Sequence, residues 1–77
     1  MEINLLAFGQ IAEITGKSTW KMTEIEDTNS LIETLEKQFP DLIAMKYSIA
    51  VNKKVIQENT KINENDTIAL LPPFSGG

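Results

Sequence analysis

The sequence predicts an α+β fold in which one main helix packs across one face of a mixed β-sheet. Two observations lead to this prediction. Residues 28–40 repeat apolar side chains at the spacing of an amphipathic helix, whereas the apolar residues on either side alternate or cluster as they do in strands. A single helix among three to five strands favours two layers that share one core.

Two strands and a short connection are expected before this helix. Their predicted bounds are residues 3–8 for the first strand, 11–16 for the connection and 18–25 for the second strand. In the first strand, Ile3, Leu5 and Ala7 share the phase that faces the core. The connection is a loop or a helical turn that Gly16 can end, because glycine adopts the left-handed conformation at little cost.

The main helix is expected to begin near Thr28 and to stop at Pro40, whose ring cannot continue a helix. Ser30 followed by Glu33 fits a capping box, and Thr28 is the alternative cap. The side chains that share its apolar face are Leu31, Ile32, Leu35 and Phe39. One further helical turn is expected over residues 41–46.

Three strands are expected after the helix. Their predicted bounds are residues 47–51, 55–56 and 67–71, with a turn at 52–54. Ile49 and Val51 face the core from the first of these strands, and Ile68 and Leu70 face it from the last. The polar stretch 58–66 supplies turns.

Some conspicuous side chains are expected to have structural roles. Trp20 and Phe39 are predicted to lie in the core. The acidic groups Glu24-Glu26-Asp27 and Glu64-Asn65-Asp66 lack the spacing of a calcium-binding loop. Both groups precede positions where turns and helix caps use such residues, so we expect them to cap and turn the chain rather than bind metal.

Composition restricts the chemistry that this chain can perform alone. Its 77 residues suffice for one small domain and include no cysteine and no histidine. Without cysteine there is no thiolate nucleophile, persulfide or disulfide. Without histidine the usual general base and the commonest transition-metal ligand are missing. We therefore expect neither a self-sufficient enzyme nor a bound cofactor or metal.

Charge and hydropathy restrict the partners and the location. The net charge of −4 argues against nucleic-acid binding, which needs a basic face. No apolar run approaches the roughly 18 residues of a membrane span. The first nine residues lack the basic region of a signal peptide. We expect a cytoplasmic protein that binds neither nucleic acid nor membrane.

The chemistry is expected in a tail, Pro72-Pro73-Phe74-Ser75-Gly76-Gly77, that follows a domain of residues 1–71. The two prolines favour an extended backbone, and Ser75, Gly76 and Gly77 add little bulk. Six residues reach at most roughly 20 Å. Such a tail can thread a narrow channel of another protein and place the Gly77 carboxylate on a reactive atom. A frayed terminus is the alternative.

The end of the sequence also resembles a known family. Ala69-Leu70-Leu71-Pro72-Pro73-Phe74-Ser75-Gly76-Gly77 looks like the C-terminus of the small subunit of molybdopterin synthase (MoaD). The segments 3–10, 28–35 and Ala50-Val51-Asn52 are similar too, so the resemblance covers essentially the whole chain. Its most specific element is Pro-Pro-x-x-Gly-Gly after the last strand. The fold that this resemblance implies is the β-grasp, or ubiquitin-like, fold.

The function that the resemblance implies is a sulfur relay. A ubiquitin-activating-like adenylyltransferase would use ATP to convert the Gly77 carboxylate into an acyl-adenylate. Sulfur from a partner's persulfide would then replace AMP and leave a thiocarboxylate. The large subunit of the synthase, joined with this chain in a heterotetramer, would receive the tail and supply the catalytic side chains. Sulfur transfer to a pyranopterin precursor would build the dithiolene of molybdopterin.

Phe8, Val55 and Leu71 are expected to form a patch that contacts a partner. Phe8 and Leu71 both lie in the outward phase of strands that are neighbours in a β-grasp sheet. An exposed apolar cluster commonly marks an interface, and the family resemblance places partner contacts at these positions. Ordinary core or edge packing is the alternative.

Three other functions stay open from the sequence. One is a sulfur carrier for thiazole synthesis or tRNA thiolation, which would share the fold and the tail. Another is a ubiquitin-like modifier that is joined through Gly77 to lysines of target proteins. The third is a plain interaction domain whose tail has no chemical role.

Overall fold

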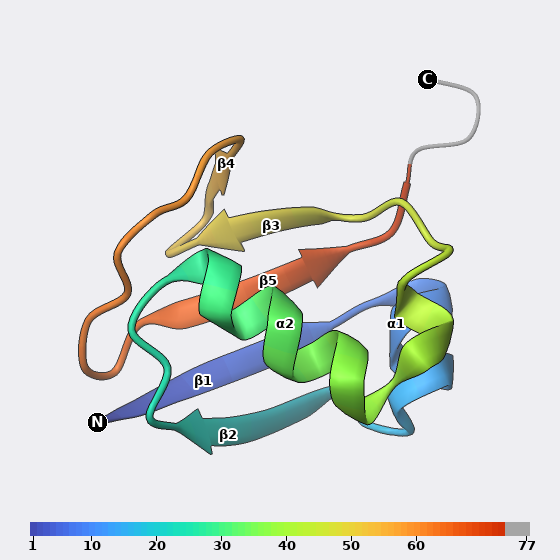
Figure 1. Cartoon of the computed structure of the whole chain (residues 1–77), viewed down its shortest axis with the longest axis horizontal. Helices are drawn as coiled ribbons and strands as arrows, with labels where there is room; N and C mark the ends of the chain where they lie inside the picture. The colour runs from blue at the N-terminus through green and yellow to red at the C-terminus, as the bar shows by residue number, and fades with distance from the viewer. Residues whose placement is uncertain (74–77) are drawn as a thin grey trace.

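Two parallel strands from opposite ends of the chain lie at the centre of the sheet. The computed structural model, which describes residues 1–73, places β1 (Glu2–Ala7) beside β5 (Thr67–Leu71). Leu5 lies opposite Ile68 in this pair. A parallel pair needs a long connection, and here the rest of the domain forms it (Figure 1).

The three other strands extend the sheet on both sides of this pair. Strand β2 (Thr19–Thr23) pairs with β1, and β3 (Ser48–Val51) joins β5 to the short strand β4 (Lys54–Ile56). All three of these pairings are antiparallel, which gives a mixed sheet of order β2-β1-β5-β3-β4. The short edge strand β4 is the strand that was predicted at residues 55–56.

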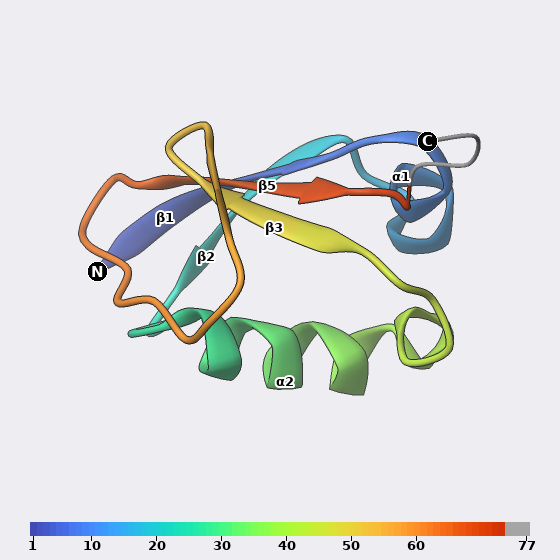
Figure 2. The same cartoon turned by 90° about the horizontal axis from the view of Figure 1, so that it is seen from above.

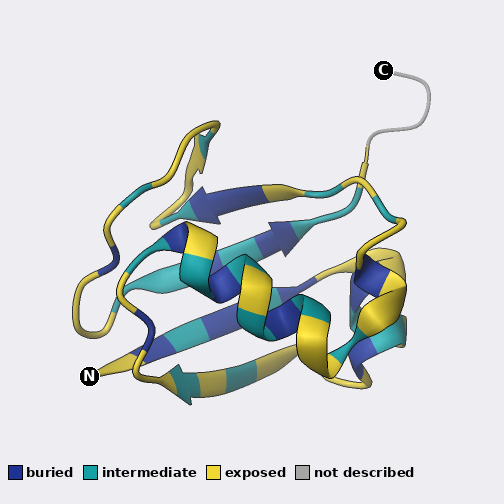
Figure 3. Ribbon diagram, viewed as in Figure 1, coloured by how far each residue is buried: buried dark blue, intermediate teal, exposed yellow. Residues whose placement is uncertain are grey.

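Helix α2 (Thr28–Gln38) crosses one face of the sheet and leaves the other face uncovered (Figure 2). The core lies between these two layers, as the burial of the facing residues shows (Figure 3). The largest fully buried side chains are Ile3, Leu5, Ile11, Leu31, Leu35, Leu42, Ile62, Ile68, Leu70 and Thr28. The predicted α+β architecture, with one helix across one face of a mixed sheet, is confirmed.

The predicted turn after the first strand is the short helix α1 (Gly9–Thr15). It ends at Gly16, whose φ of 73° lies in the left-handed region and whose N–H donates to the carbonyl of Ala12. Glycine adopts this conformation without the Cβ clash that other residues suffer, so the predicted role of Gly16 is confirmed.

The cap of helix α2 is Asp27, so the predicted capping by Ser30 with Glu33, or by Thr28, is wrong. Asp27 has an extended backbone and its carboxylate accepts a hydrogen bond of 2.8 Å from the Ser30 N–H. This bond, together with the Ser30 hydroxyl and Asn59, holds the pKa of Asp27 below its ordinary value. Thr28 and Ser30 lie inside the helix because Asp27 already satisfies the helix start.

The chain beyond α2 differs from the expected turn at 41–46. Helix α2 ends at Gln38 and Phe39 leaves the helical region, which suits the residue before a proline. Pro40 then begins a short 3-10 helix, η1 (Pro40–Leu42). Leu42 is buried, whereas Ile43 is 64% exposed.

Four core assignments need correction. Ile62 is only 1% exposed although it lies in the stretch predicted to be polar turns. Trp20 and Phe39 pack against the core but are only half-buried. The Trp20 position on edge strand β2 leaves one side of the ring without a neighbouring strand. Val51 faces the core as predicted, opposite Ile68, but it is only half-buried, and Ala50 on the opposite phase is more buried.

Thr28 joins the start of α2 to the loop that carries Ile62. Its hydroxyl accepts a hydrogen bond of 2.9 Å from the Thr60 N–H and donates one of 3.3 Å to Asn59. Asn59 also accepts from the Asn29 N–H. Thr28 itself is 1% exposed, so its two bonds are partly shielded from water, whereas the bond between Asn29 and Asn59 lies at the surface.

We expect Thr28→Val to lower the free energy of unfolding by about 1–3 kcal/mol, because the part-buried Thr60 N–H would lose its partner. Thr34→Val is the matched control. The Thr34 hydroxyl only donates to the carbonyl of Ser30, so its loss leaves no donor unpaired. Chemical denaturation of both variants measures the difference, and equal losses would contradict the role of Thr28.

Candidate functional site

The face of the sheet away from α2 carries a row of small and apolar side chains across four strands. Residues that pair across strands point to the same face. Leu6 pairs with Ala69, Ala69 with Ala50, and Ala50 with Val55. These residues alternate along their strands with buried residues such as Leu5 and Leu70. The row therefore lies on the uncovered face.

This row forms the floor of a groove of about 460 Å³. The residues that line it are Leu6, Phe8, Ala50, Asn52, Lys53, Val55, Thr67, Ala69 and Leu71. Phe8 is 47% exposed, Val55 is 52% exposed and Leu71 is half-buried. The three residues predicted to form an apolar patch thus lie around one groove. That a partner binds there stays a prediction.

One wall of the groove is the two-residue turn between β3 and β4, which rises on the side of the sheet away from α2 (Figure 2). Asn52 ties this turn to the start of β5. Its side chain accepts a hydrogen bond of 2.9 Å from the Thr67 N–H and donates one of 2.9 Å to Asp66. The bond from Asn52, with a second from the Asn63 N–H, holds the pKa of Asp66 below its ordinary value.

The root of the predicted tail lies beside this groove. Leu71 lines the groove, and the next residue, Pro72, is half-buried against the start of α1. A Cβ added to Gly9 would lie 3.2 Å from the Cγ of Pro72, so the two segments are in close contact. Pro73 is exposed. The other predicted tail residues, Phe74, Ser75, Gly76 and Gly77, lie outside the described residues.

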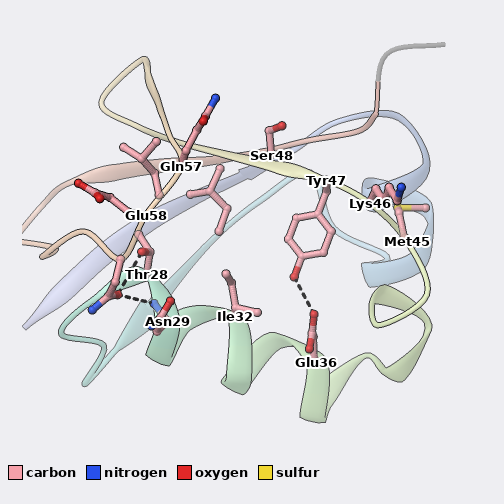
Figure 4. Close-up of a pocket in the computed structure, with 13 residues that line it drawn as sticks. Thr28, Asn29, Ile32, Glu36, Met45, Lys46, Tyr47, Ser48, Gln57 and Glu58 are labelled. Carbon is pink, nitrogen blue, oxygen red and sulfur yellow. Dashed lines mark hydrogen bonds between the residues drawn. The ribbon is translucent and has the colours of Figure 1, made fainter.

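A second cavity, of about 470 Å³, opens between α2, the start of β3 and residues 56–59 (Figure 4). The Tyr47 hydroxyl donates a hydrogen bond of 3.2 Å to Glu36 inside it. Burial, and then the negative charge of Glu36, raise the pKa of Tyr47 to about 12. A phenol with so high a pKa stays protonated at neutral pH, so it acts as a hydrogen-bond donor and not as a base.

Two kinds of feature are absent from residues 1–73. That part of the chain contains no group of three or more His, Cys, Asp or Glu arranged to hold a metal ion. It also contains no helix that is long and apolar enough to cross a membrane. Asp27 caps α2 and Asp66 braces the β3–β4 turn, so the structural roles predicted for these two acidic residues are confirmed.

The sequence pattern located Phe8, Val55 and Leu71 but missed most of the groove. No role in the patch was predicted for Ala50. Lys53 was assigned only to a turn. Sheet register could have found Ala50, since its pairing with Ala69 and Val55 follows once the strand order is known.

Almost the whole chain, including the tail, matches a known protein family. Residues 5–77 match the ThiS family. The molybdopterin synthase sulfur carrier subunit of Dictyostelium discoideum is 34% identical over 99% of this chain and 96% of its own length. The subunit of the same name from Arabidopsis thaliana is 30% identical over 100% of this chain and 84% of its own length.

Solved structures with the same fold include proteins of the same and of related names. A protein from Pyrococcus furiosus described as molybdopterin converting factor subunit 1 superposes with a TM-score of 0.86 at 16% identity, covering 96% of this chain and 99% of its own. Subunit 1 in the complex of subunits 1 and 2 from Helicobacter pylori gives 0.75 at 26% identity over 100% of both chains. The small archaeal modifier protein SAMP1 of Haloferax volcanii gives 0.80 at 20% identity, again over 100% of both chains. The fold is thus the ubiquitin-like β-grasp.

Proposed function

The chain belongs to the ThiS family, and on this premise we propose that it is the sulfur carrier subunit of a molybdopterin synthase. The observation that carries the proposal is the match, along essentially the whole chain, to relatives of that name at 30% and 34% identity. The groove beside the tail root adds a docking surface that a carrier needs. The Helicobacter pylori relative was solved with a second subunit, which supports a two-subunit assembly.

We propose that the sulfur is carried on the backbone carboxylate of Gly77. The chain has no cysteine, so it cannot hold sulfur as a persulfide. A carboxylate is a poor electrophile, and it must first gain a good leaving group. The Gly77 carboxylate attacks the α-phosphorus of ATP on an adenylyltransferase, pyrophosphate leaves, and an acyl-adenylate forms.

The terminal sulfur of a partner's persulfide then attacks the acyl carbon of this adenylate, and AMP leaves with the bonding electron pair. The product is an acyl disulfide between carrier and donor. A second thiol of the donor attacks the donor's own sulfur and forms a disulfide with it. This step frees the thiocarboxylate of Gly77. Because the relay consumes ATP, we place it in the cytoplasm.

In the last stage the groove docks the large subunit of the synthase. Leu71 lies in the groove and is followed directly by the tail, so docking there fixes the point from which the tail enters the partner. Pro72 and Pro73 stiffen the entry, and Phe74, Ser75 and Gly76 thread toward the active site. The large subunit supplies the catalytic side chains, and the thiocarboxylate gives its sulfur to a pyranopterin precursor. The assembly we propose is a heterotetramer.

Intact-mass spectrometry of the protein isolated from its native host tests this proposal. We expect a form in which one oxygen of the Gly77 carboxylate is replaced by sulfur, and fragmentation should place the change on that residue. Isopeptide adducts between Gly77 and lysines of other proteins would instead indicate a modifier. An unmodified tail in cells that are making molybdopterin would refute the carrier function and leave an interaction domain.

A further inference from the structure

The groove has one charged residue among those of its described lining, and that residue is a cation. Lys53 lies at its wall in a chain whose net charge is −4. Within residues 1–73 no carboxylate lies within ion-pair distance of the Lys53 ammonium. The carboxylate of Asp66, which braces the same turn, already accepts hydrogen bonds from Asn52 and Asn63. The charge of Lys53 is therefore directed to solvent beside an apolar floor.

The backbone at Lys53 is in a conformation that lysine disfavours. Val51 pairs with Lys54, so Asn52 and Lys53 form a two-residue hairpin turn, with φ of 50° and 74°. Turns with positive φ at both central residues prefer asparagine followed by glycine. Asn52 fits this preference, but the second position holds lysine instead of glycine. The positive φ of Lys53 strains its backbone, and glycine would relieve this strain. The presence of lysine at a groove wall in this conformation points to a function for its side chain.

We propose that Lys53 selects the partner of the groove by pairing with a carboxylate beside the apolar surface that fills it. This inference rests on the proposed function, and the partner to which it applies is the large subunit. The surface of the large subunit that fits the groove is an apolar projection with an acidic residue at its edge. The projection covers Phe8, Val55 and Leu71. The short turn tied down by Asn52 holds the backbone of Lys53 in one place.

A charge at the rim of an interface acts mainly on association. Complementary charges raise the association rate and suppress partners of the wrong charge, and both effects weaken with salt. The rest of the chain has a net negative charge, which would repel an acidic partner surface. Lys53 therefore gives the groove a local positive charge, opposite in sign to the net charge of the molecule.

The test compares Lys53→Glu with Lys54→Glu, by binding of each full-length variant to the purified large subunit of the same organism. The two variants change the net charge equally at neighbouring exposed positions. Lys54 does not line the groove, because it pairs with Val51, whose other partner is the core residue Ile68. We expect Lys53→Glu to slow association by about tenfold at low salt and to flatten its salt dependence, with a much smaller effect of Lys54→Glu.

Lys53→Gly separates the binding role from a structural one. Glycine suits the positive φ, so this variant should melt at a higher temperature than the parent while it binds the large subunit more weakly. Equal effects of the two glutamate variants, or unchanged binding of Lys53→Gly, would overturn the role of Lys53 and leave the proposed function intact. If the unaltered chain fails to bind the large subunit, the proposed function fails, and this inference fails with it.

Discussion

Deleting Gly77 is expected to abolish sulfur transfer without disturbing the fold. The deletion moves the terminal carboxylate back by about 3.5 Å, the length of one extended residue. Misplacement of a reacting group by even 1 Å can cost about a hundredfold in rate, so we expect at least that loss in sulfur loading. Within residues 1–73 the buried hydrophobic core runs from Ile3 to Leu70, and Gly77 lies beyond it.

Formation of the thiocarboxylate by the cognate adenylyltransferase and sulfur donor measures this loss, and a thermal melt measures the fold. Gly77→Ala keeps the length of the tail and adds a methyl group, so it separates the effect of tail length from the effect of bulk. One alanine added after Gly77 should block loading as the deletion does. Normal loading of the shortened chain would show that the carboxylate position is not critical. A large fall in melting temperature would show that Gly77 belongs to the packed domain.

The alternation of apolar residues predicted the sheet well because the core lies on one face of each strand. Ile3, Leu5 and Ala7 share one face of β1, and Ile68 and Leu70 share one face of β5, and the two strands turn these faces to the same core. The spacing of Leu31 and Leu35 fixed the buried side of α2 in the same way. Local periodicity carries this information, so no knowledge of the strand order was needed.

Contacts between distant segments could not be predicted in this way. Asn59 donates a hydrogen bond to Asp27, the cap of α2, although the two residues are more than thirty positions apart. Ile62 is buried because its segment is joined to Glu26 by a backbone hydrogen bond. A lone apolar residue in a polar stretch carries no periodicity, so nothing local marked Ile62 as part of the core.

In the candidate site too, local patterns could be predicted, whereas contacts between distant segments could not. Phe8 and Leu71 were predicted together because the first and last strands are neighbours in a β-grasp sheet, and the register confirms that these strands pair. The contribution of Lys53 depends on a turn type and on the bonds of Asn52 to Thr67 and Asp66. Those bonds join segments that are 14 and 15 residues apart, and sequence spacing alone does not show them.

Replacing Leu71 with glutamate is expected to weaken binding of the large subunit by about ten- to hundredfold. Leu71 is half-buried on the uncovered face, where it lines the groove together with Phe8 and Val55. Covering such a side chain stabilises association by roughly 1.5–3 kcal/mol, and about 1.4 kcal/mol corresponds to tenfold in affinity. A carboxylate in its place would lose its hydration without gaining a partner, which adds to the loss.

Isothermal titration of the variant with the large subunit measures the loss, and Gln38→Glu is the matched control. Gln38 is an exposed residue at the end of α2, on the layer away from the groove, so its replacement adds the same charge outside the proposed interface. The melting temperature of Leu71→Glu should stay close to that of the parent, because Leu71 is already partly hydrated in the free chain. Unchanged affinity would show that the groove is not the interface. A collapse of the melt would show instead that Leu71 acts through the core, because its removal would then disturb β5 beside the buried Leu70.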